Sequence, residues 1–319
     1  MDNFAPMNTA EVMDRAVHVY KTSFFKQILF SGIYHFVSVY AVGIVGLIIT
    51  AMLSIVFIGI FSAAGGFVVL LSLLLGGIFI LWFSVAQAGH ILLSKNAFFG
   101  EKVQLKLGML PRISFRVFFT IIAQVIALIP YVALLILFFA ATEHIIIVTF
   151  TNFWLEFFII MFVFVFWVLL FFVYFHIFSL SVAVSVFEKK AFFGALLRSW
   201  KLLRREFWKT FGARTLWVLV IGIVWTSIFG IFGLIAGGTE FVMDAVFSNT
   251  SAVFSPILLV IFGILSIVTY FIVAPLDGVF HATLYFNQRI KKEGLDIEIK
   301  LAKLEEKLKA APKGEGEPK

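Results

Sequence analysis

The chain contains 319 residues, of which 62% are hydrophobic and only 13% are charged, and its mean hydropathy is +1.07. A soluble domain cannot bury that much apolar surface beneath so little polar cover, whereas a lipid bilayer solvates it, so the composition predicts an integral membrane protein. The absence of cysteine excludes disulfides, thiolate metal sites and cysteine nucleophiles.

The first predicted element is a short amphipathic helix at residues 9–20, which we expect to lie at the membrane surface. Its apolar side is formed by Val12, Met13, Ala16, Val19 and Tyr20. An apolar stretch without a single Lys, Arg, Asp or Glu then runs from 28 to 93. A helix needs about 20 residues to cross the hydrocarbon, so this stretch predicts two uncleaved spans joined near residues 62–66.

A basic connector at residues 95–116 opens with the sequence KNAFFG, and a second connector opens with KKAFFG at 189–194. Five of the six positions agree, and both connectors join one apolar run to the next, so we interpret the match as an internal repeat. Pro111 interrupts the first connector and makes its helix insecure. Between the connectors, apolar runs predict a third span at 117–141 and a fourth at 153–187.

The second connector, residues 189–209, has a clear helical periodicity. Apolar residues recur on one face, namely Phe192, Leu196, Trp200, Leu203 and Phe207. Basic residues fall on the opposite face, namely Arg198, Lys201, Arg204, Arg205 and Lys209. Such a helix is typical of the boundary between lipid tails and phosphate headgroups. These basic residues are candidates for contact with anionic lipid or with an acidic partner; the alternative is that they only mark topology and adhere to the surface.

A fifth span is predicted at about 211–235, ended by Gly237 and Gly238, and a sixth begins at Pro256 and ends near Tyr285. A surface helix plus a helical hairpin thus occurs three times, in units of about 9–93, 95–187 and 189–286. We therefore expect an all-α integral membrane fold with six transmembrane helices in three pseudo-repeated units.

Residues 287–319 are predicted to form a cytoplasmic tail. Its apolar residues Ile297, Leu301, Leu304 and Leu308 are spaced as on one face of a short amphipathic helix, which we interpret as a docking site for a cytoplasmic protein. The final residues, PKGEGEPK, are too polar and too rich in helix breakers to fold.

The 25 Lys and Arg residues all fall before the first span, in the two basic connectors or in the tail, and the other three connectors carry none. Under the positive-inside rule this places both termini and both basic connectors on the cytoplasmic side of the inner membrane. The net charge of +7 therefore points to anionic lipids and not to nucleic acid.

Asp277 is the only carboxylate predicted in the interior of a span, since Glu156 stands at the far-side end of the fourth. Acids inside a membrane are costly, which makes Asp277, with His281 one turn later, a candidate polar site for a proton or cation step. The alternative is that the pair is structural, bonded at i and i+4 or facing a hydrated vestibule.

The far-side connectors hold Glu143 and His144, and Glu240 and Asp244. If they converged, their oxygens and imidazole could bind a divalent metal ion. The alternative is that these acids are simply what remains once basic residues are confined to the other face. No catalytic motif occurs, and we expect no cofactor.

Three motifs can be compared with known families: the opening helix at 9–25, FGALLRSW at 193–200 with FWK at 207–209, and LYFNQRIKKEGLD at 284–296. In these motifs the chain resembles the prokaryotic polytopic membrane domain related to the membrane portion of some glycerophosphodiester phosphodiesterases. It implies the membrane fold alone. The catalytic domain of those enzymes has a His-Arg motif, which this chain lacks, so no active-site residue is carried over.

Three functions remain open. The first is a non-enzymatic membrane protein that organises lipids or partner proteins at the cytoplasmic face. The alternative is a transporter or lipid-moving protein with a polar path around Asp277, because transporters often arise by duplication. An intramembrane hydrolase using the far-side acids is the third reading.

Overall fold

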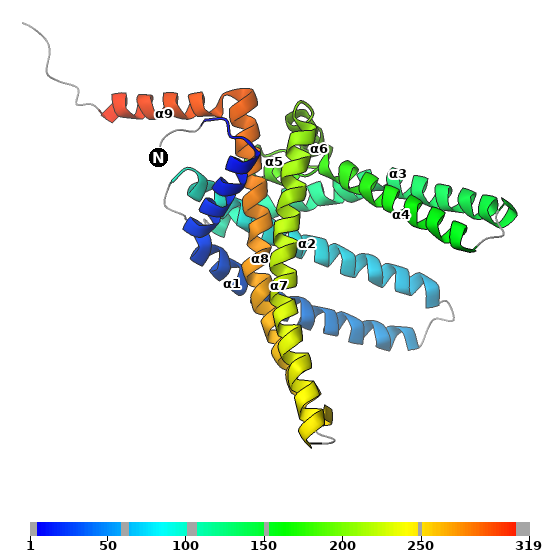
Figure 1. Cartoon of the computed structure of the whole chain (residues 1–319). Helices are drawn as coiled ribbons and strands as arrows, with labels where there is room; N and C mark the ends of the chain where they lie inside the picture. Colours follow the sequence, from blue (N-terminus) through cyan, green and yellow to red (C-terminus); the bar gives the residue numbers. More distant parts are fainter. Residues whose placement is uncertain (1–4, 59–63, 101–106, 150–152, 248–250, 311–319) are drawn as a thin grey trace, which may run out of the picture.

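The computed structural model describes residues 5–58, 64–100, 107–149, 153–247 and 251–310 (Figure 1). Within these ranges the description leaves out the side chains of residues 36–76, 79, 107, 139, 141–156, 235–259, 262, 303 and 306–310. Every element in the described ranges is helical, as predicted. The elements are α1 (Thr9–Ile58), α2 (Ala64–Phe98), the 3-10 turn η1 (Leu107–Met109), α3 (Leu110–Thr149), α4 (Phe153–His176), α5 (Ser181–Phe187), α6 (Phe193–Leu203), α7 (Phe207–Phe247), α8 (Ser251–Glu293) and α9 (Leu295–Ala310).

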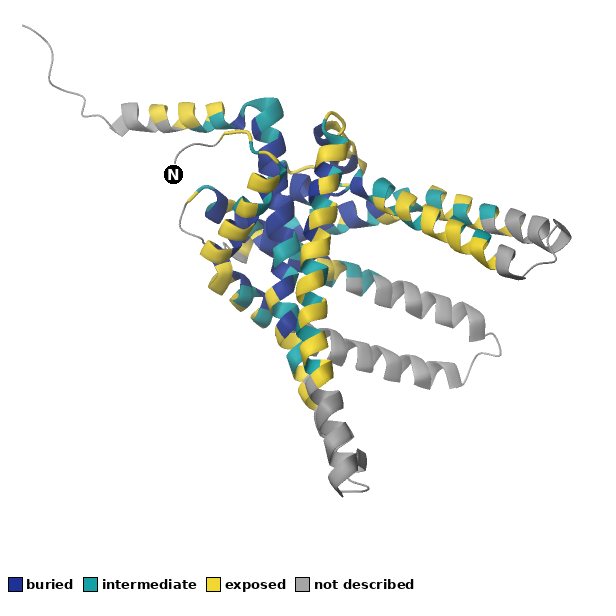
Figure 2. Cartoon of the chain, in the orientation of Figure 1, coloured by how far each residue is buried: buried dark blue, intermediate teal, exposed yellow. Residues whose placement is uncertain are grey.

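Three helical hairpins, α1–α2, α3–α4 and α7–α8, meet at one end and diverge at the other (Figure 1). We call the region where they meet, which includes α5, α6 and the end of α8, the convergent end. The buried residues gather there (Figure 2). Phe98 of α2 stacks on Phe286 of α8 with ring centroids 4.9 Å apart, and Trp217 of α7 stacks on Phe280 at 5.0 Å. Helix α8 thus carries much of the core.

The hairpins expose large apolar side chains along the parts that leave the convergent end. Four stretches of the described residues are long and apolar enough to cross a membrane, namely Leu110–Phe138, Phe157–Phe187, Phe207–Leu234 and Gly263–Glu293. Their outward side chains include Leu137, Phe162 and Leu234. Such apolar surface is stable only when lipid covers it, so the protein is a helical membrane protein.

The predicted surface helix at 9–20 is not a separate element. It is the beginning of α1, which continues without a break for 50 residues, about 75 Å at 1.5 Å per residue. Its apolar side does form one face, but Val12, Ala16, Val19 and Tyr20 are buried in the protein core and do not face lipid. The hydroxyl of Tyr20 donates a hydrogen bond of 2.6 Å to the carbonyl of Ile272 in α8.

The predicted fourth span is interrupted, because α4 ends at His176 and α5 begins at Ser181. Backbone groups freed by this break bond to Ser199 of α6: its hydroxyl donates to the carbonyl of Ile177 at 2.8 Å and accepts from the amide of Leu180 at 3.2 Å. A break near lipid is tolerated when its backbone groups are satisfied in this way.

Three other predicted boundaries are also wrong. Helix α7 runs through Gly237 and Gly238 to Phe247, since each interior glycine costs only about 1 kcal/mol of helix stability. Helix α8 begins at Ser251, before Pro256, and continues past Tyr285 to Glu293. The predicted helix at 189–209 is confined to α6 and the first residues of α7, with a turn between them.

Candidate functional site

The charged side chains of the convergent end form a cluster around Glu188, the residue after α5. The Nε of Arg198 donates to both Glu188 carboxylate oxygens, at 2.9 and 2.8 Å, and Lys190 Nζ lies 3.1 Å from the same carboxylate. Arg198 also pairs with Glu293 at the end of α8, and the Tyr285 hydroxyl donates to Glu188 at 3.1 Å. The cluster therefore fastens α5, α6 and α8 together.

The pKa values of this cluster follow from two opposing effects. Burial raises the pKa of Glu188, but hydrogen bonds and positive charge from Arg198 and Lys190 lower it by more, so the pKa lies below 4.5. Burial lowers the pKa of Arg198, and the bonds to Glu188 and Glu293 more than reverse this. Both groups are thus charged in the folded protein near neutral pH.

A second ion pair joins the α6–α7 turn to α8. Glu206 accepts from Lys291 Nζ at 3.1 Å and from the amide nitrogen of Gln288 at 3.2 Å. Burial raises the pKa of Glu206, but the bond from Lys291 and then that from Gln288 bring it below 4.5. Lys292 donates to the carbonyl of Leu202 near the end of α6, a position where a cation offsets the negative end of a helix.

The five basic residues predicted to share one face of the 189–209 segment fall into two groups, four that are exposed and one that is held in ion pairs. Lys201, Arg204, Arg205 and Lys209 are exposed around the end of α6 and the start of α7. No ion pair among the described residues involves Lys201, Arg204 or Arg205. Arg198 departs from the prediction, since its side chain is only 15% exposed and is held by Glu188 and Glu293.

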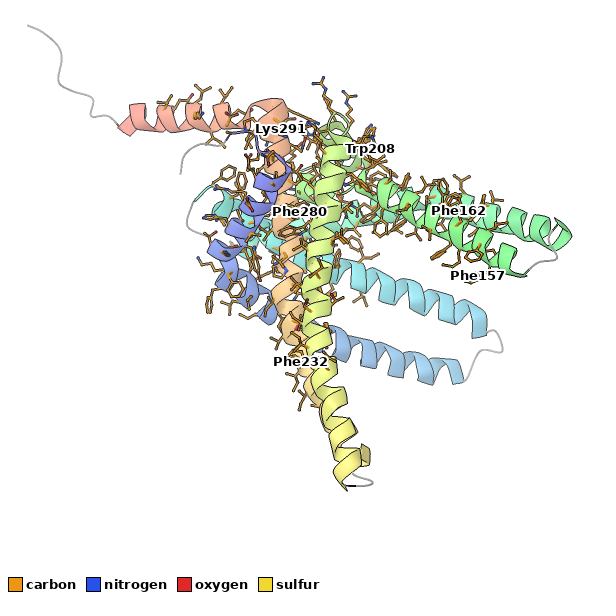
Figure 3. The ribbon with its side chains drawn as sticks, viewed as in Figure 1. Phe157, Phe162, Trp208, Phe232, Phe280 and Lys291 are labelled. Carbon is orange, nitrogen blue, oxygen red and sulfur yellow. The ribbon has the colours of Figure 1, made fainter. Side chains whose placement is uncertain are left out.

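Two exposed tryptophans accompany these cations. Trp200 lies on α6, and Trp208 at the start of α7 is 71% exposed (Figure 3). Of the predicted apolar face, Leu196 and Leu203 are buried in the protein, whereas Trp200 and Phe192 remain exposed. Exposed indoles beside Lys and Arg are typical of the interface between lipid and water.

A cavity of about 580 Å³ opens between the beginning of α1, the beginning of α7 and the end of α8. Its polar lining includes Glu206, Lys209, Gln288 and Lys291. Asn287 fixes the segment before α1, because its side chain accepts from the Met7 amide at 2.9 Å and donates to the Met7 carbonyl at 3.2 Å. Asp277 is not among the lining residues.

Asp277 and His281 lie together on α8, as their spacing predicted. The Nδ1 of His281 donates to the Asp277 carbonyl at 2.8 Å and lies 3.3 Å from a carboxylate oxygen, while the Asp277 side chain is 44% exposed. Asp277 interacts electrostatically with Arg214 of α7, whose guanidinium lies 5.0 Å from the ring centre of Phe175. This polar group therefore links α4, α7 and α8.

Three other histidines of the apolar helices join one helix to another. The bonds are His35 to Tyr270 at 3.1 Å, His90 to Gln27 at 2.7 Å and His176 to Thr210 at 3.1 Å. Each bond connects two different helices and satisfies polar groups in an otherwise apolar region.

The four residues that the sequence offered as metal ligands lie outside the side chains that the structure describes, so the metal site stays a prediction. Glu143 and His144 lie on α3, and Glu240 and Asp244 lie on α7, but their side chains fall outside the described part. Among the side chains that are described, no group of three His, Asp or Glu residues could hold a metal ion.

Sequence reasoning missed the acidic partners of the basic connectors. Glu188, Glu206 and Glu293 stand within or beside strongly basic segments, where an acid is readily taken for part of a solvated surface. Their positions in the sequence could have marked two of these acids as structural. Glu188 directly follows the fourth apolar run. Glu293 directly precedes Gly294, where a positive φ of 66° marks the end of α8.

Comparisons with protein-family models, with curated proteins and with solved structures return no significant match. Function can therefore be inferred only from this chain's own residues.

Proposed function

We propose that this chain is a non-enzymatic membrane protein that binds anionic phospholipid at its cytoplasmic face and organises lipids or partner proteins there. The observation that carries the proposal is a set of exposed cations, Lys201, Arg204, Arg205 and Lys209, flanked by exposed Trp200 and Trp208. They lie at the convergent end, from which the apolar parts of the hairpins, here called the apolar arms, extend. Each cation near an anionic surface contributes about 1 kcal/mol, so the four together contribute about 4 kcal/mol, reduced by salt.

The proposal includes the topology expected from the sequence: six spans in three repeated units, with both termini in the cytoplasm of a prokaryotic cell. The lengths of α1 and α2, 50 and 35 residues, leave room for one span each in addition to the four stretches described above. The expected relation to the membrane portion of glycerophosphodiester phosphodiesterases belongs to the same proposal and assigns no catalytic residue.

The tail helix α9 supports a role in binding a cytoplasmic partner. Leu295 and Ile299 pack against the core, while Ile297, Leu301 and Leu304 are exposed. At about 100° per residue, Ile299 lies on the side of α9 opposite to Leu301. The exposed stripe therefore faces away from the body of the protein, where a partner helix can reach it.

Lipid selectivity tests the proposal. The full chain is reconstituted in phosphatidylcholine vesicles, and electron paramagnetic resonance measures how strongly spin-labelled phosphatidylglycerol is preferred over spin-labelled phosphatidylcholine. We expect a preference that falls with salt and that is largely lost in the triple variant Lys201→Glu, Arg204→Glu, Arg205→Glu. The matched control reverses Lys300, Lys303 and Lys307 of α9. Equal selectivity in the triple variant, the control and the wild type would rule the proposal out.

A second candidate function is transport, favoured by one observation: Asp277, His281 and Arg214 place ionisable groups between α7 and α8 among apolar arms. Flux of protons or phospholipid through proteoliposomes measures it. If the site acts in transport, Asp277→Asn abolishes flux without loss of folded protein. Flux that is absent in the wild type, or unchanged in the variant, removes Asp277 from any such mechanism.

A further inference from the structure

The exposed apolar stripe of α9 has the spacing of a coiled-coil seam. Ile297, Leu301 and Leu304 are exposed, and Leu308 follows them in the sequence. The intervals of 4, 3 and 4 residues alternate as the a and d positions of a heptad repeat do, whereas a helix that packs on a globular core has a wider apolar stripe. The stripe therefore fits a single partner helix that lies along it.

The opposite side of α9 already packs against the chain's own core. In the heptad that places Leu301 at position a, Ile299 stands at position f, the position farthest from the seam, and it contacts the core together with buried Leu295. Figure 1 shows α9 extending from the convergent end on the side opposite to the hairpins α1–α2 and α3–α4. The residues of the seam thus face away from the body of the protein.

The charge of α9 favours a protein helix over an anionic membrane surface. Its sequence, LDIEIKLAKLEEKLKA, holds four Lys and four Asp or Glu residues, so the helix has no net charge, and it has no aromatic residue. Helices that lie in an anionic membrane surface usually combine a basic polar face with aromatic anchors. The seam of α9 and the cations of the α6–α7 turn therefore suit different partners.

The charges beside the seam fit a second copy of α9. Lys300 and Lys307 stand at g positions of the heptad, and Glu298 and Glu305 stand at e positions. In a parallel pair, each g residue faces the e residue of the next heptad, so Lys300 meets the partner's Glu305, twice by symmetry. In an antiparallel pair, lysines would face lysines and glutamates would face glutamates. The parallel arrangement is thus the self-complementary one.

Both residues of this pair are available for it. Lys300 and Glu305 are exposed, and no ion pair among the described side chains involves either of them. Glu298 has no lysine to face, because the g position before Lys300 is Glu293 of α8, and it lies instead 3.9 Å from Arg289 of its own chain. The fold therefore leaves exposed the two charges that a parallel pair of α9 helices brings together.

We propose that α9 forms a parallel coiled coil with α9 of a second copy of this chain in the same membrane. This inference deepens the partner-binding part of the proposed function and rests on it, because a parallel pair requires the tails of both copies on one side of the membrane. Two heptads bury too little surface to hold separate helices together in water, but a shared membrane raises the effective concentration of the two copies. The pair therefore forms in membranes and separates in dilute detergent.

Disulfide cross-linking in membranes tests the pair, since the chain has no cysteine of its own. Ile297→Cys places one thiol at the first d position, where a parallel pair brings the same residue of both copies together. We expect oxidation by copper phenanthroline to convert this variant to a cross-linked dimer. The matched control is Ala302→Cys, exposed at position b, which should give only the background of random collisions.

Charge reversal and its rescue test the role of Lys300 and Glu305. In the Ile297→Cys chain, Lys300→Glu should lower the cross-linking rate about five- to tenfold, because two attractions become two repulsions. The double reversal Lys300→Glu, Glu305→Lys restores opposite charges and should restore the rate. Both positions are exposed, so neither change should disturb the fold, and a circular dichroism melt of each variant verifies this.

Three results would overturn the pair. They are equal yields for Ile297→Cys and Ala302→Cys, a rate that charge reversal leaves unchanged, and cross-linking of Ile297→Cys to co-expressed Leu308→Cys in place of itself, which marks an antiparallel pair. If Ile297→Cys does not cross-link but is shielded from a water-soluble maleimide, the stripe lies against lipid or another protein, and this outcome also overturns the proposal.

These results are distinct from failure of the lipid-binding role. Reversal of Lys201, Arg204 and Arg205 should remove the preference for anionic lipid and leave the cross-linking of Ile297→Cys unchanged. Lys300→Glu should do the opposite, lowering the cross-linking rate and leaving the lipid preference intact.

Discussion

Arg198 holds Glu188 with two hydrogen bonds from the same Nε atom, 2.9 and 2.8 Å long, and thereby fixes α6 against the end of α5. Both side chains are largely buried, with 15% and 12% of their surface exposed. An arginine expected to face lipid headgroups is thus a structural residue. In the proposed function, the contact with lipid headgroups is made instead by the exposed cations that lie farther along the same segment.

Removing the Arg198 side chain should therefore weaken the fold. Arg198→Gln leaves the Glu188 carboxylate with fewer donors, and we expect a loss of about 2 kcal/mol, below the roughly 3–5 kcal/mol of a fully buried pair. Lys190→Gln is the control, since Lys190 pairs with the same carboxylate but is 47% exposed, and its loss should stay under about 1 kcal/mol. Chemical denaturation in detergent measures both. Equal losses would show that burial of the Arg198 pair adds nothing.

Acid should destabilise the protein through Glu188 and Glu206. The folded-state pKa of each lies below the ordinary value of 4.5, so their stabilisation is present above that pH and is lost as pH falls through the folded pKa. We expect a melting temperature that changes little between about pH 7 and 5 on their account and falls below about pH 4.5. Glu188→Gln should reduce the fall in melting temperature below about pH 4.5, whereas Glu305→Gln in α9 should not. If the melting temperature of Glu188→Gln fell in acid as steeply as that of the wild type, Glu188 would not be a source of the acid sensitivity.

Helix α8 packs closely against α2 at Gly278. A Cβ built on Gly278 would lie 2.8 Å from the Cβ of His90, too close for any side chain to fit without moving the helices. Gly278→Ala should cost about 1–3 kcal/mol. Gly263→Ala, on the same helix with nothing within 4 Å, should be neutral or stabilising by up to about 1 kcal/mol. The two melting temperatures decide the matter, and a harmless Gly278→Ala would contradict the packing.

The apolar arms and the position of the convergent end follow well from the sequence. Long runs without charge can only be lipid-facing helices, and the basic segments indicate where polar structure gathers. Helix breaks were harder to predict, because Gly237 and Gly238 do not end α7 whereas the apolar run after His176 is interrupted. No local pattern marks that interruption, since Ser199, which bonds to its backbone, lies on another helix and reaches it only through tertiary contact.

The site was predicted only in part for a related reason. Periodicity places Arg198 on a helix face, but it says nothing about which neighbouring helix covers that face. The carboxylate of Glu293 is distant in the chain and reaches Arg198 only through the path of α8. The i and i+4 contact of Asp277 with His281 is local, and it was accordingly predictable.

The two sides of α9 should differ in their effect on stability. Leu295 is buried, so Leu295→Ala should cost about 2–3 kcal/mol, toward the low end for a core leucine. Leu301→Ala, on the exposed stripe, should change the free energy of unfolding by less than about 0.5 kcal/mol. Denaturant titration of the two variants compares them. A large loss at Leu301 would mean that the stripe is covered by the protein itself, which leaves no surface for a partner.

The proposed lipid-binding role requires that the α6–α7 turn lie on the cytoplasmic side of the membrane. Since the chain has no cysteine, Lys201→Cys and Glu240→Cys each introduce one unique thiol. A membrane-impermeant maleimide applied to intact cells should label Glu240→Cys alone, and applied to inside-out vesicles it should label Lys201→Cys alone. Labelling of Lys201→Cys from outside the cell, or of both thiols from one side, would contradict the proposed orientation and with it the cytoplasmic lipid site.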